Sequence, residues 1–314
     1  MTEIEERSEQ IKQKALELGF LACGISRADF LPEEKKHLEE WLVERHNGEM
    51  TYMERNLDKR LDPRLLVENA RSVVSVLLNY FSDKLQEDPA APVISKYAYG
   101  RDYHFVMKDK LHLLLKYIRE EVAPCNGRVF VDSAPVLDRT WASKAGLGWI
   151  GKNTNLISVE HGSFFFIGEL VIDLELEPDE KLVRNHCGTC TRCIDACPTG
   201  AIVKPFVLDA RKCISYQTIE KKGDLDGSLK GKFENRVFGC DICQDVCPWN
   251  LKSATHREPE FEPRPRLLQL TKEEWQQMDK PLFDELFKDS AVQRTGFNGL
   301  KRNLKFIDRK GHSM

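Results

Sequence analysis

The cysteines are the residues of this chain most suited to chemistry, since eight of the ten lie between positions 187 and 247. Four of them have the spacing C-x2-C-x2-C-x3-C-P: Cys187, Cys190, Cys193 and Cys197. In bacterial ferredoxins such a run gives three thiolates to one [4Fe–4S] cluster and the fourth to a second cluster. The run therefore predicts two iron–sulfur clusters and a role in electron transfer.

A second, incomplete run follows, made of Cys240, Cys243 and Cys247. It lacks one local cysteine, and Cys213 upstream can supply the missing ligand, so that eight thiolates serve two clusters. Cys197 and Cys247 each lie four residues after the preceding cysteine and directly before a proline, which places each at the other cluster. The predicted ligands of cluster 1 are Cys187, Cys190, Cys193 and Cys247. The predicted ligands of cluster 2 are Cys197, Cys213, Cys240 and Cys243.

Two other uses of these cysteines are less consistent with the sequence. Zinc sites also contain paired C-x2-C runs, but eight sulfurs with two C-x3-C-P endings favour iron–sulfur clusters. Disulfides are disfavoured because the acidic residues 1–7 lead into an amphipathic helix instead of a secretory signal. No apolar run has the length of a membrane span. The sequence thus predicts a cytoplasmic protein that does not bind a membrane.

The composition is that of a globular protein, with 31% charged and 41% hydrophobic residues among 314. The net charge of −3 argues against indiscriminate nucleic-acid binding but leaves room for a local basic face. Such a face is possible near the end of the chain, where one acid, Asp308, accompanies six basic residues: Arg294, Lys301, Arg302, Lys305, Arg309 and Lys310. A solvated helix face explains these charges equally well.

The elements that position these residues follow from hydrophobic periodicity. Helices are predicted at 4–18, 31–46, 102–121 and 137–144, and strands at 20–25, 72–80, 128–131 and 164–174. This alternation predicts an α/β or α+β domain over residues 1–176. A cluster domain at 177–256 and a short helical region at 257–314 complete the predicted organisation.

The first domain contains a glycine-rich stretch, Gly146 to Lys152, that fits G-x-G-x-x-G only loosely. It follows a predicted helix instead of a strand, and no acidic ribose partner lies at the expected distance, which makes a nucleotide site improbable. Glycines also allow the backbone to approach a flat, bulky cofactor closely.

Several segments together resemble the epoxyqueuosine reductase family, the cobalamin-dependent enzymes of the last step of tRNA queuosine synthesis. The resemblance covers about residues 5–306 and rests on the segments 46–53, 59–64, 131–139 and 145–153 and on the cluster run with Cys213-Ile-Ser-Tyr216. It implies a nitroreductase-like, corrinoid-binding first domain and a ferredoxin-like second domain. Longer members end in HEAT-like repeats that help bind tRNA. Residues 299–304 look like the first repeat helix, so the tRNA grip here is expected to involve the basic stretch at 301–310.

The resemblance also implies a reaction. The two clusters would pass electrons to cobalamin, bound as cob(II)alamin and cycling through Co(I), which reduces epoxyqueuosine to queuosine at the wobble position of tRNA. An external low-potential donor would supply the electrons, and the protein is expected to act as a monomer. Asp132, at the end of a predicted strand, would protonate the departing oxygen, because burial raises a carboxyl pKa and keeps the proton in place. Its alternative role is to cap the helix that begins near Pro135.

The cobalamin contacts that the resemblance implies are Tyr97, Asp132, Lys152, Asn153 and Ser215. A D-x-H-x-x-G cobalt-binding signature is absent, so His104 is interpreted as structural and cobalamin is expected to lack a protein histidine on cobalt. Arg139 is assigned either to a substrate phosphate or to a structural ion pair.

Two other functions are compatible with paired iron–sulfur clusters. A reductive dehalogenase-like enzyme shares the corrinoid and the paired clusters but acts on small halogenated molecules. A non-catalytic electron-transfer protein would hold clusters and no cobalt.

Overall fold

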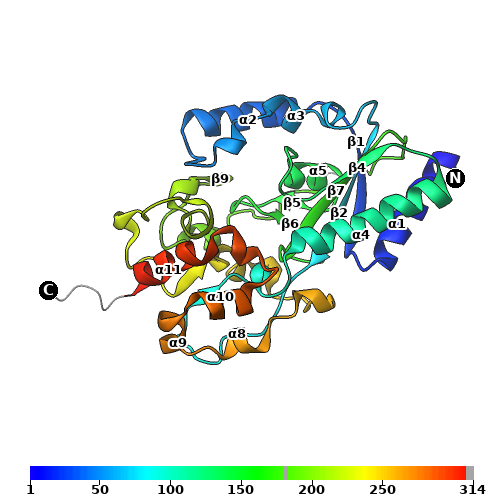
Figure 1. Cartoon of the computed structure of the whole chain (residues 1–314). Coiled ribbons are helices and arrows are strands. Elements are labelled where there is room, and N and C mark those ends of the chain that lie inside the picture. Colours follow the sequence, from blue (N-terminus) through cyan, green and yellow to red (C-terminus); the bar gives the residue numbers. More distant parts are fainter. Residues whose placement is uncertain (180–182, 309–314) are drawn as a thin grey trace.

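A four-stranded antiparallel sheet is the centre of the first half of the chain in the computed structural model, which describes residues 1–179 and 183–308 (Figure 1). Its order is β1–β2–β7–β4, with the bounds β1 (Ala22–Arg27), β2 (Ser72–Asn79), β4 (Gly127–Phe130) and β7 (Phe165–Ile172). All four predicted strands are thereby confirmed. Because every pair in this sheet is antiparallel, the domain is α+β in type.

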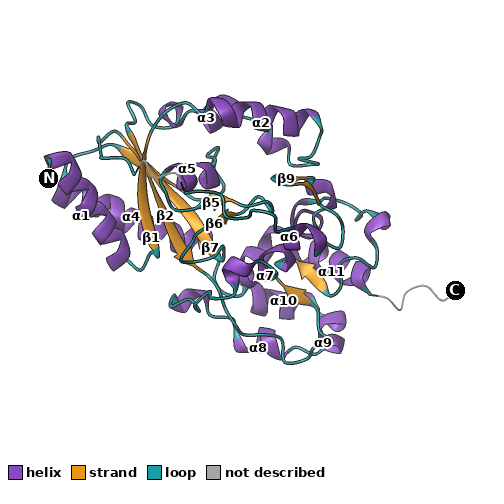
Figure 2. Ribbon diagram, turned by 180° about the vertical axis from the view of Figure 1, so that it is seen from behind, coloured by secondary structure: helices purple, strands orange, loops and turns teal. Residues whose placement is uncertain are grey.

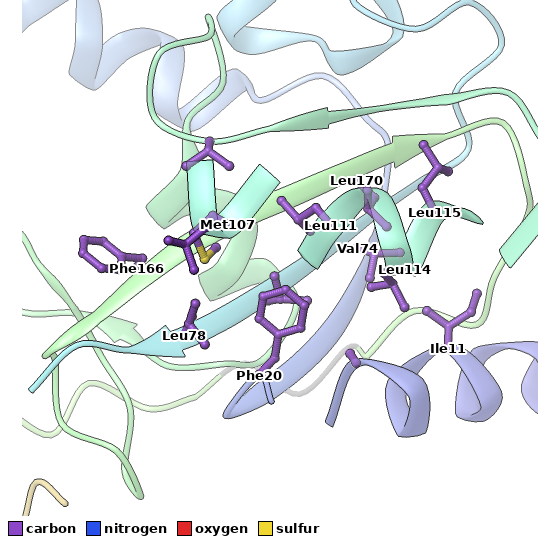
Figure 3. Packing of buried hydrophobic residues seen from close by; sticks show 14 of the residues in the cluster. Ile11, Phe20, Val74, Leu78, Met107, Leu111, Leu114, Leu115, Phe166 and Leu170 are labelled. Atoms are coloured by element: carbon purple, nitrogen blue, oxygen red, sulfur yellow. The ribbon is translucent and has the colours of Figure 1, made fainter. Parts of the chain in front are cut away.

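Both faces of the sheet are covered by helices, which explains why β2 and β7 are apolar along nearly their whole length. On one face lie α1 (Glu3–Glu17) and α4 (Tyr103–Tyr117). Their side chains interdigitate with those of the sheet, as Ile11, Leu111 and Val74 do in Figure 3. On the other face α5 (Asp138–Lys144) packs with Trp141 against Val73 and Val171.

Two further helices complete that side of the molecule. They are α2 (Pro32–Val43) and α3 (Leu57–Leu61). Leu31 and Leu61 join the cluster of buried residues around Trp141. The four helices predicted in the first domain are confirmed, with ends within a few residues of those expected.

The region that contains the cysteines is built from short elements joined by loops (Figure 2). These are α6 (Arg192–Asp195), α7 (Ile242–Asp245) and the hairpin of β8 (Ile202–Lys204) and β9 (Val207–Leu208). A second hairpin, β5 (Trp149–Ile150) with β6 (Leu156–Ile157), lies between the central sheet and this region (Figure 2). The rings of Trp149 and Trp249 meet edge to face at 5.0 Å and join the two parts.

The last part of the described chain is helical, as predicted, but it is not a separate appendage. Its helices are α8 (Pro265–Gln269), α9 (Lys272–Gln277), α10 (Lys280–Phe287) and α11 (Gly296–Ile307). They share a core with residues 91–99 and with β10 (Arg236–Phe238), which pairs in parallel with β3 (Val93–Ile94). Segments of all three predicted domains therefore meet in one core.

Asn303 fixes α11 to this core. Its side chain is fully buried, and Nδ2 donates to the carbonyl oxygens of Thr218 and Val237, at 2.8 Å each. We expect Asn303→Ala to destabilise the protein by about 2–4 kcal/mol, because two buried carbonyls lose their donor. Thermal unfolding of the cluster-loaded protein measures this, with Lys305→Ala, an exposed position on the same helix, as the control. Equal stability of the two variants would contradict the role of Asn303.

None of the helices in the described residues is both long and apolar enough to span a bilayer.

Candidate active site and cluster region

The cysteine sulfurs lie in two adjoining groups. The pKa of the Cys193 thiol is raised first by burial and then by the neighbouring sulfurs of Cys187, Cys247 and Cys190. Burial also raises the pKa of Cys247, and the sulfurs of Cys187 and Cys190 add to this effect. Four thiolates crowded in this way repel one another, so a bound cation or cluster stabilises them.

The second group contains the cysteine that lies outside both runs. Burial raises the pKa of Cys240 to about 12, and Cys213 contributes to this rise. Cys213 in turn has Cys197 as a neighbour. The pKa of Cys243 is raised by burial and then by Cys213 and Cys240. Cys193 of the first group also contributes, so the two groups adjoin.

Backbone amides point at several of these sulfurs. The N–H of Ala201 donates to Cys197 Sγ at 3.3 Å. Burial raises the pKa of Cys213, and hydrogen bonds from the N–H groups of Tyr216 and Ser215 partly oppose that rise. Hydrogen bonds to sulfur stabilise the anionic form and set the potential of iron–sulfur clusters. Among the described residues no three His, Cys, Asp or Glu side chains converge closely enough to hold one metal ion.

Two residues of the glycine-rich stretch bind the cluster loops. Lys152 Nζ donates to the carbonyl oxygens of Gly188 and Cys190, at 2.7 and 2.9 Å. Asn153 is buried, and its Nδ2 donates to the carbonyl oxygen of Cys243 at 3.4 Å. Both side chains therefore support the cysteine loops in this structure, whatever else they contact.

Two more of the five residues predicted to contact cobalamin, Ser215 and Tyr97, lie near the second cysteine group. Burial raises the pKa of the Cys213 thiol, and a hydrogen bond from the Ser215 hydroxyl partly opposes this rise. Tyr97 packs against Tyr103 and Phe238, with ring centroids 6.0 Å from each. Burial raises the pKa of Tyr97 well above its usual value, and Asp132 and Asp241 contribute. Tyr97 thus interacts electrostatically with the Asp132 carboxylate and with Asp241, which follows Cys240 in the sequence.

Asp132 occupies an unusual backbone position just after β4. Its φ of 50° is in the left-handed region, which non-glycine residues adopt mainly where surrounding structure imposes it. Its carboxylate accepts a hydrogen bond from Tyr103 Oη at 2.8 Å and lies 3.5 Å from His104 Nε2. The helix that follows, α5, has Leu137 at its N-cap and no side-chain cap. The alternative role of Asp132 as a helix cap is therefore wrong.

His104 connects Asp132 to a second carboxylate. Its Nδ1 lies 2.8 Å from Asp102 Oδ1, and Asp102 also caps α4 through the N–H of His104. The stacked ring of Tyr103, 4.2 Å away, fixes the plane of the imidazole. Sequence reasoning treated His104 as merely structural and so missed this contact. The available signal was Asp102-Tyr-His104 at the start of a helix, which places both side chains at one helix end.

The pKa of Asp132 differs in direction from the one expected, because of its contact with His104. Although the Asp132 carboxylate is partly exposed, the surrounding protein desolvates it and so raises its pKa, but hydrogen bonds from His104 and Tyr103 outweigh this effect and hold the pKa below its usual value. The prediction of a raised pKa was therefore wrong. Burial lowers the pKa of His104, yet the bonds to Asp102 and Asp132 prevail and raise it to about 9. At neutral pH the proton thus lies on His104, and Asp132 is a carboxylate whose side chain is 65% exposed.

Residues from distant segments surround this carboxylate. The pKa of Tyr52 is raised to about 12, first by burial and then by Glu220. Arg294 opposes this rise, and Asp132 adds to it. Arg294, just before α11, forms an ion pair with Glu220 at 2.6 Å, and it interacts with Asp132 as well. The basic stretch near the end of the chain thus begins at the candidate site.

The rest of that stretch is largely tied to the protein. Arg302 donates to the carbonyl oxygens of Lys221 and Gly223, and Lys301 donates to that of Met278. A purely solvated helix face is therefore wrong for these two residues. Arg309 and Lys310 lie outside the described residues.

Comparison with known proteins identifies the family. The model "Epoxyqueuosine reductase QueG, DUF1730" matches residues 60–133, and the model "4Fe-4S double cluster binding domain" matches residues 186–250. An epoxyqueuosine reductase of Cellulophaga algicola is 56% identical over 303 residues, which cover 96% of this chain and 98% of the relative. The chain belongs to the epoxyqueuosine reductase family. The enzyme of Escherichia coli K12 is 40% identical over 96% of this chain and 80% of its own length.

Solved structures agree with this assignment to the epoxyqueuosine reductases. An epoxyqueuosine reductase in complex with an epoxyqueuosine-modified tRNA-Tyr stem loop has a TM-score of 0.89 at 30% identity and covers 96% of this chain and 80% of its own. The reductive dehalogenase NpRdhA has a TM-score of 0.54 at 17% identity, covering 97% of this chain and 38% of its own, and shows a shared fold alone. The chain therefore contains a double [4Fe–4S] cluster domain within an epoxyqueuosine reductase fold.

Proposed function

We propose that this protein reduces epoxyqueuosine to queuosine at the wobble position of tRNA. The observation that carries this proposal is the Asp132 carboxylate, open to solvent and held by Tyr103 and His104 in a chain that is 56% identical to an epoxyqueuosine reductase. The reaction converts an epoxide into an alkene and water and consumes two electrons and two protons. A relative crystallised with a modified tRNA stem loop supports the substrate.

The cysteine sulfurs fit two [4Fe–4S] clusters with crossed ligands. Cluster 1 is supported by the effects that four thiols have on one another's pKa values: Cys187, Cys190, Cys193 and Cys247. Those of Cys197, Cys213, Cys240 and Cys243 support cluster 2. Because Cys193 also affects Cys243, electrons from an external low-potential donor can pass from one cluster to the other.

The site between cluster 2 and Asp132 fits cobalamin. Tyr97 and Ser215 lie on the cluster side, and the exposed carboxylate of Asp132 lies on the substrate side. His104 is already engaged by two carboxylates, which agrees with cobalamin lacking a protein histidine on cobalt. When bound, cobalamin supplies a strongly reducing cobalt centre that accepts single electrons. Lys152 and Asn153 would contribute from the loop that braces the cysteines.

The first proton would be held and transferred by residues of this chain. His104 holds it at neutral pH, and Asp132, 3.5 Å away, is the group positioned to pass it to the departing oxygen. Tyr103 donates to the same carboxylate oxygen and fixes its orientation. The corrinoid domain would comprise residues 1–176, with cluster and helical regions at 177–256 and 257–314. The protein would act as a cytoplasmic monomer, with Arg294 close to the bound anticodon loop.

The proposed function is tested by anaerobic turnover. The protein, with reconstituted clusters, added cobalamin and a strong reductant, is incubated with tRNA that carries epoxyqueuosine, and nucleosides are measured by mass spectrometry. We expect queuosine to form. Absence of queuosine, with cobalamin bound and reduced, would refute the substrate and leave the cofactor assignment in place.

His104→Gln tests the proton store. We expect single-turnover queuosine formation at pH 7 to slow by about 10²-fold, the lower end of general acid–base effects. In the unmodified protein the rate should fall as pH rises through about 9, because the imidazolium loses its proton, and this decline should be missing from the variant. His112→Gln, an exposed histidine on the same helix, is the control. A variant that retains the decline near pH 9 would show that another group donates.

A further inference from the structure

A carboxyl group lies in the apolar core beneath the candidate site. Glu169 is in the middle of β7 and is fully buried. Alternation along the strand puts it on the same face as Val171, which packs against Trp141 of α5. A lone ionised carboxylate in such a place is strongly disfavoured, so it is protonated or shares a proton with a partner.

The partner is Asp138, the first residue of α5. Asp138 and Glu169 are within hydrogen-bonding contact of each other. Among the described residues no donor reaches either Glu169 oxygen or Asp138 Oδ1, all of which are buried. Two carboxyl groups form a hydrogen bond only if one of them carries a proton. The geometry of the pair therefore requires at least one proton in the core.

One more polar atom accompanies the pair. Ser75 of β2 lies directly opposite Glu169 in the sheet, and its buried hydroxyl has no partner in the described residues. Cross-strand neighbours on one face are close enough to interact. Ser75, Glu169 and Asp138 are thus three polar groups in an otherwise apolar layer, and the Ser75 hydroxyl donates to neither carboxyl group.

Exposure of the carboxyl groups increases from the core toward the candidate site. Glu169 is fully buried, Asp138 is half-buried, and Asp132 is exposed. Asp138 and Asp132 are six residues apart on the segment that connects β4 to α5. The Asp132 carboxylate raises the pKa of both Asp138 and Glu169.

Two arginines interact electrostatically with both Asp138 of the pair and Asp132 of the candidate site. Arg139 interacts with Asp138 and with Asp132, and Arg60 of α3 interacts with the same two carboxylates. Arg60 is buried, and its Nε has no partner in the described part of the chain. With Asp132, these arginines are the charged groups that act on the pair, and they stabilise negative charge left when a proton departs.

We propose that Asp138 and Glu169 store a shared proton and supply the second proton of the reaction, with Asp138 passing it toward the active site. This rests on the proposed function. The epoxide oxygen takes one proton from the His104–Asp132 unit as the first C–O bond breaks. It takes the second from the pair as the other C–O bond breaks, the alkene forms and water leaves. The two electrons come from the external donor through the clusters, and solvent refills both stores.

The protonation of the pair is consistent with its surroundings. Burial raises the pKa of Asp138, and burial followed by Asp138 raises that of Glu169 well above its usual value. Because both values are raised, the pair retains its proton at neutral pH and loses it as pH rises. Asp138 and Glu169 do not touch the substrate in this scheme, because their proton reaches the epoxide oxygen through Asp132.

Glu169→Gln tests the proposal, because the amide keeps the shape and a hydrogen bond to Asp138 but carries no transferable proton. In the cluster-loaded protein without substrate, infrared spectroscopy at pH 7 should show a protonated carboxyl in the unmodified protein and its loss in the variant. With epoxyqueuosine tRNA, single-turnover queuosine formation should slow by at least about tenfold, and added acetic acid should restore part of the rate. Glu160→Gln, an exposed position, is the control.

Three results would overturn the proposal: no protonated carboxyl at pH 7, an unchanged rate, or a slow variant that acetic acid does not rescue. If Glu169→Gln fails to fold, Asp138→Asn takes its place with the same measurements. If the unmodified protein itself forms no queuosine, the proposed function fails, and the infrared result still decides whether the pair holds a proton.

Discussion

Asp132→Asn should lower queuosine formation by about 10²–10⁴-fold, the range typical of losing a general acid. The amide is similar in shape but cannot relay a proton from His104. Asp132 also holds the pKa of His104 up, so the variant histidine gives up its proton at a lower pH. Both effects act on proton delivery, and iron content and cobalamin binding should be unchanged. Anaerobic single-turnover assays with nucleoside mass spectrometry measure the loss.

The control for this variant is Asp109→Asn, an exposed position on α4 that lacks contact with Asp132. It should convert epoxyqueuosine at the rate of the unmodified protein. Near-normal turnover by Asp132→Asn would remove Asp132 from the chemistry and leave Tyr103 or His104 to act directly.

Cys247→Ser should remove the cluster that Cys187, Cys190 and Cys193 hold, although Cys247 lies far from them in the sequence. Serine replaces a soft thiolate by a poor iron ligand, and three remaining thiolates bind a cluster less tightly. We expect iron content to fall by roughly half and turnover to be lost, since electrons no longer pass between two clusters. Iron analysis and electron paramagnetic resonance distinguish the two clusters.

Two further variants make this result specific. Cys213→Ser should remove the other cluster and leave the first intact. Cys125→Ser changes a cysteine outside both groups and should retain both clusters. Loss of the Cys213 cluster in Cys247→Ser would refute the crossed ligand sets.

Part of this organisation follows from the sequence because it is local. The spacing of Cys187 to Cys197 fixes how sulfurs converge, whatever the remaining fold. The strands at 72–80 and 164–174 are apolar on both faces, as central strands must be. Their antiparallel order does not follow from such patterns, because pairing depends on contacts distant in sequence. The sequence therefore left α/β and α+β open.

The candidate site was harder to predict for the same reason. Asp132 was recognised, but the direction of its pKa depends on His104 and Tyr103, which belong to a helix almost thirty residues earlier. Burial alone would raise that pKa, and the opposite direction requires the observed contacts. Lys152 and Asn153 were likewise assigned by their loop, whereas their partners Cys190 and Cys243 become neighbours only in the folded chain.

The parallel pairing of β3 with β10 has a consequence for synthesis of the chain on the ribosome. Residues 91–99 find their packing partners in β10 and in α8 to α11, which emerge last (Figure 1). Until then Ile94 and Tyr99 remain exposed, and the first half of the chain has an incomplete core. Stable cluster insertion is therefore expected only after α8 to α11 have been synthesised, later than the cysteines themselves.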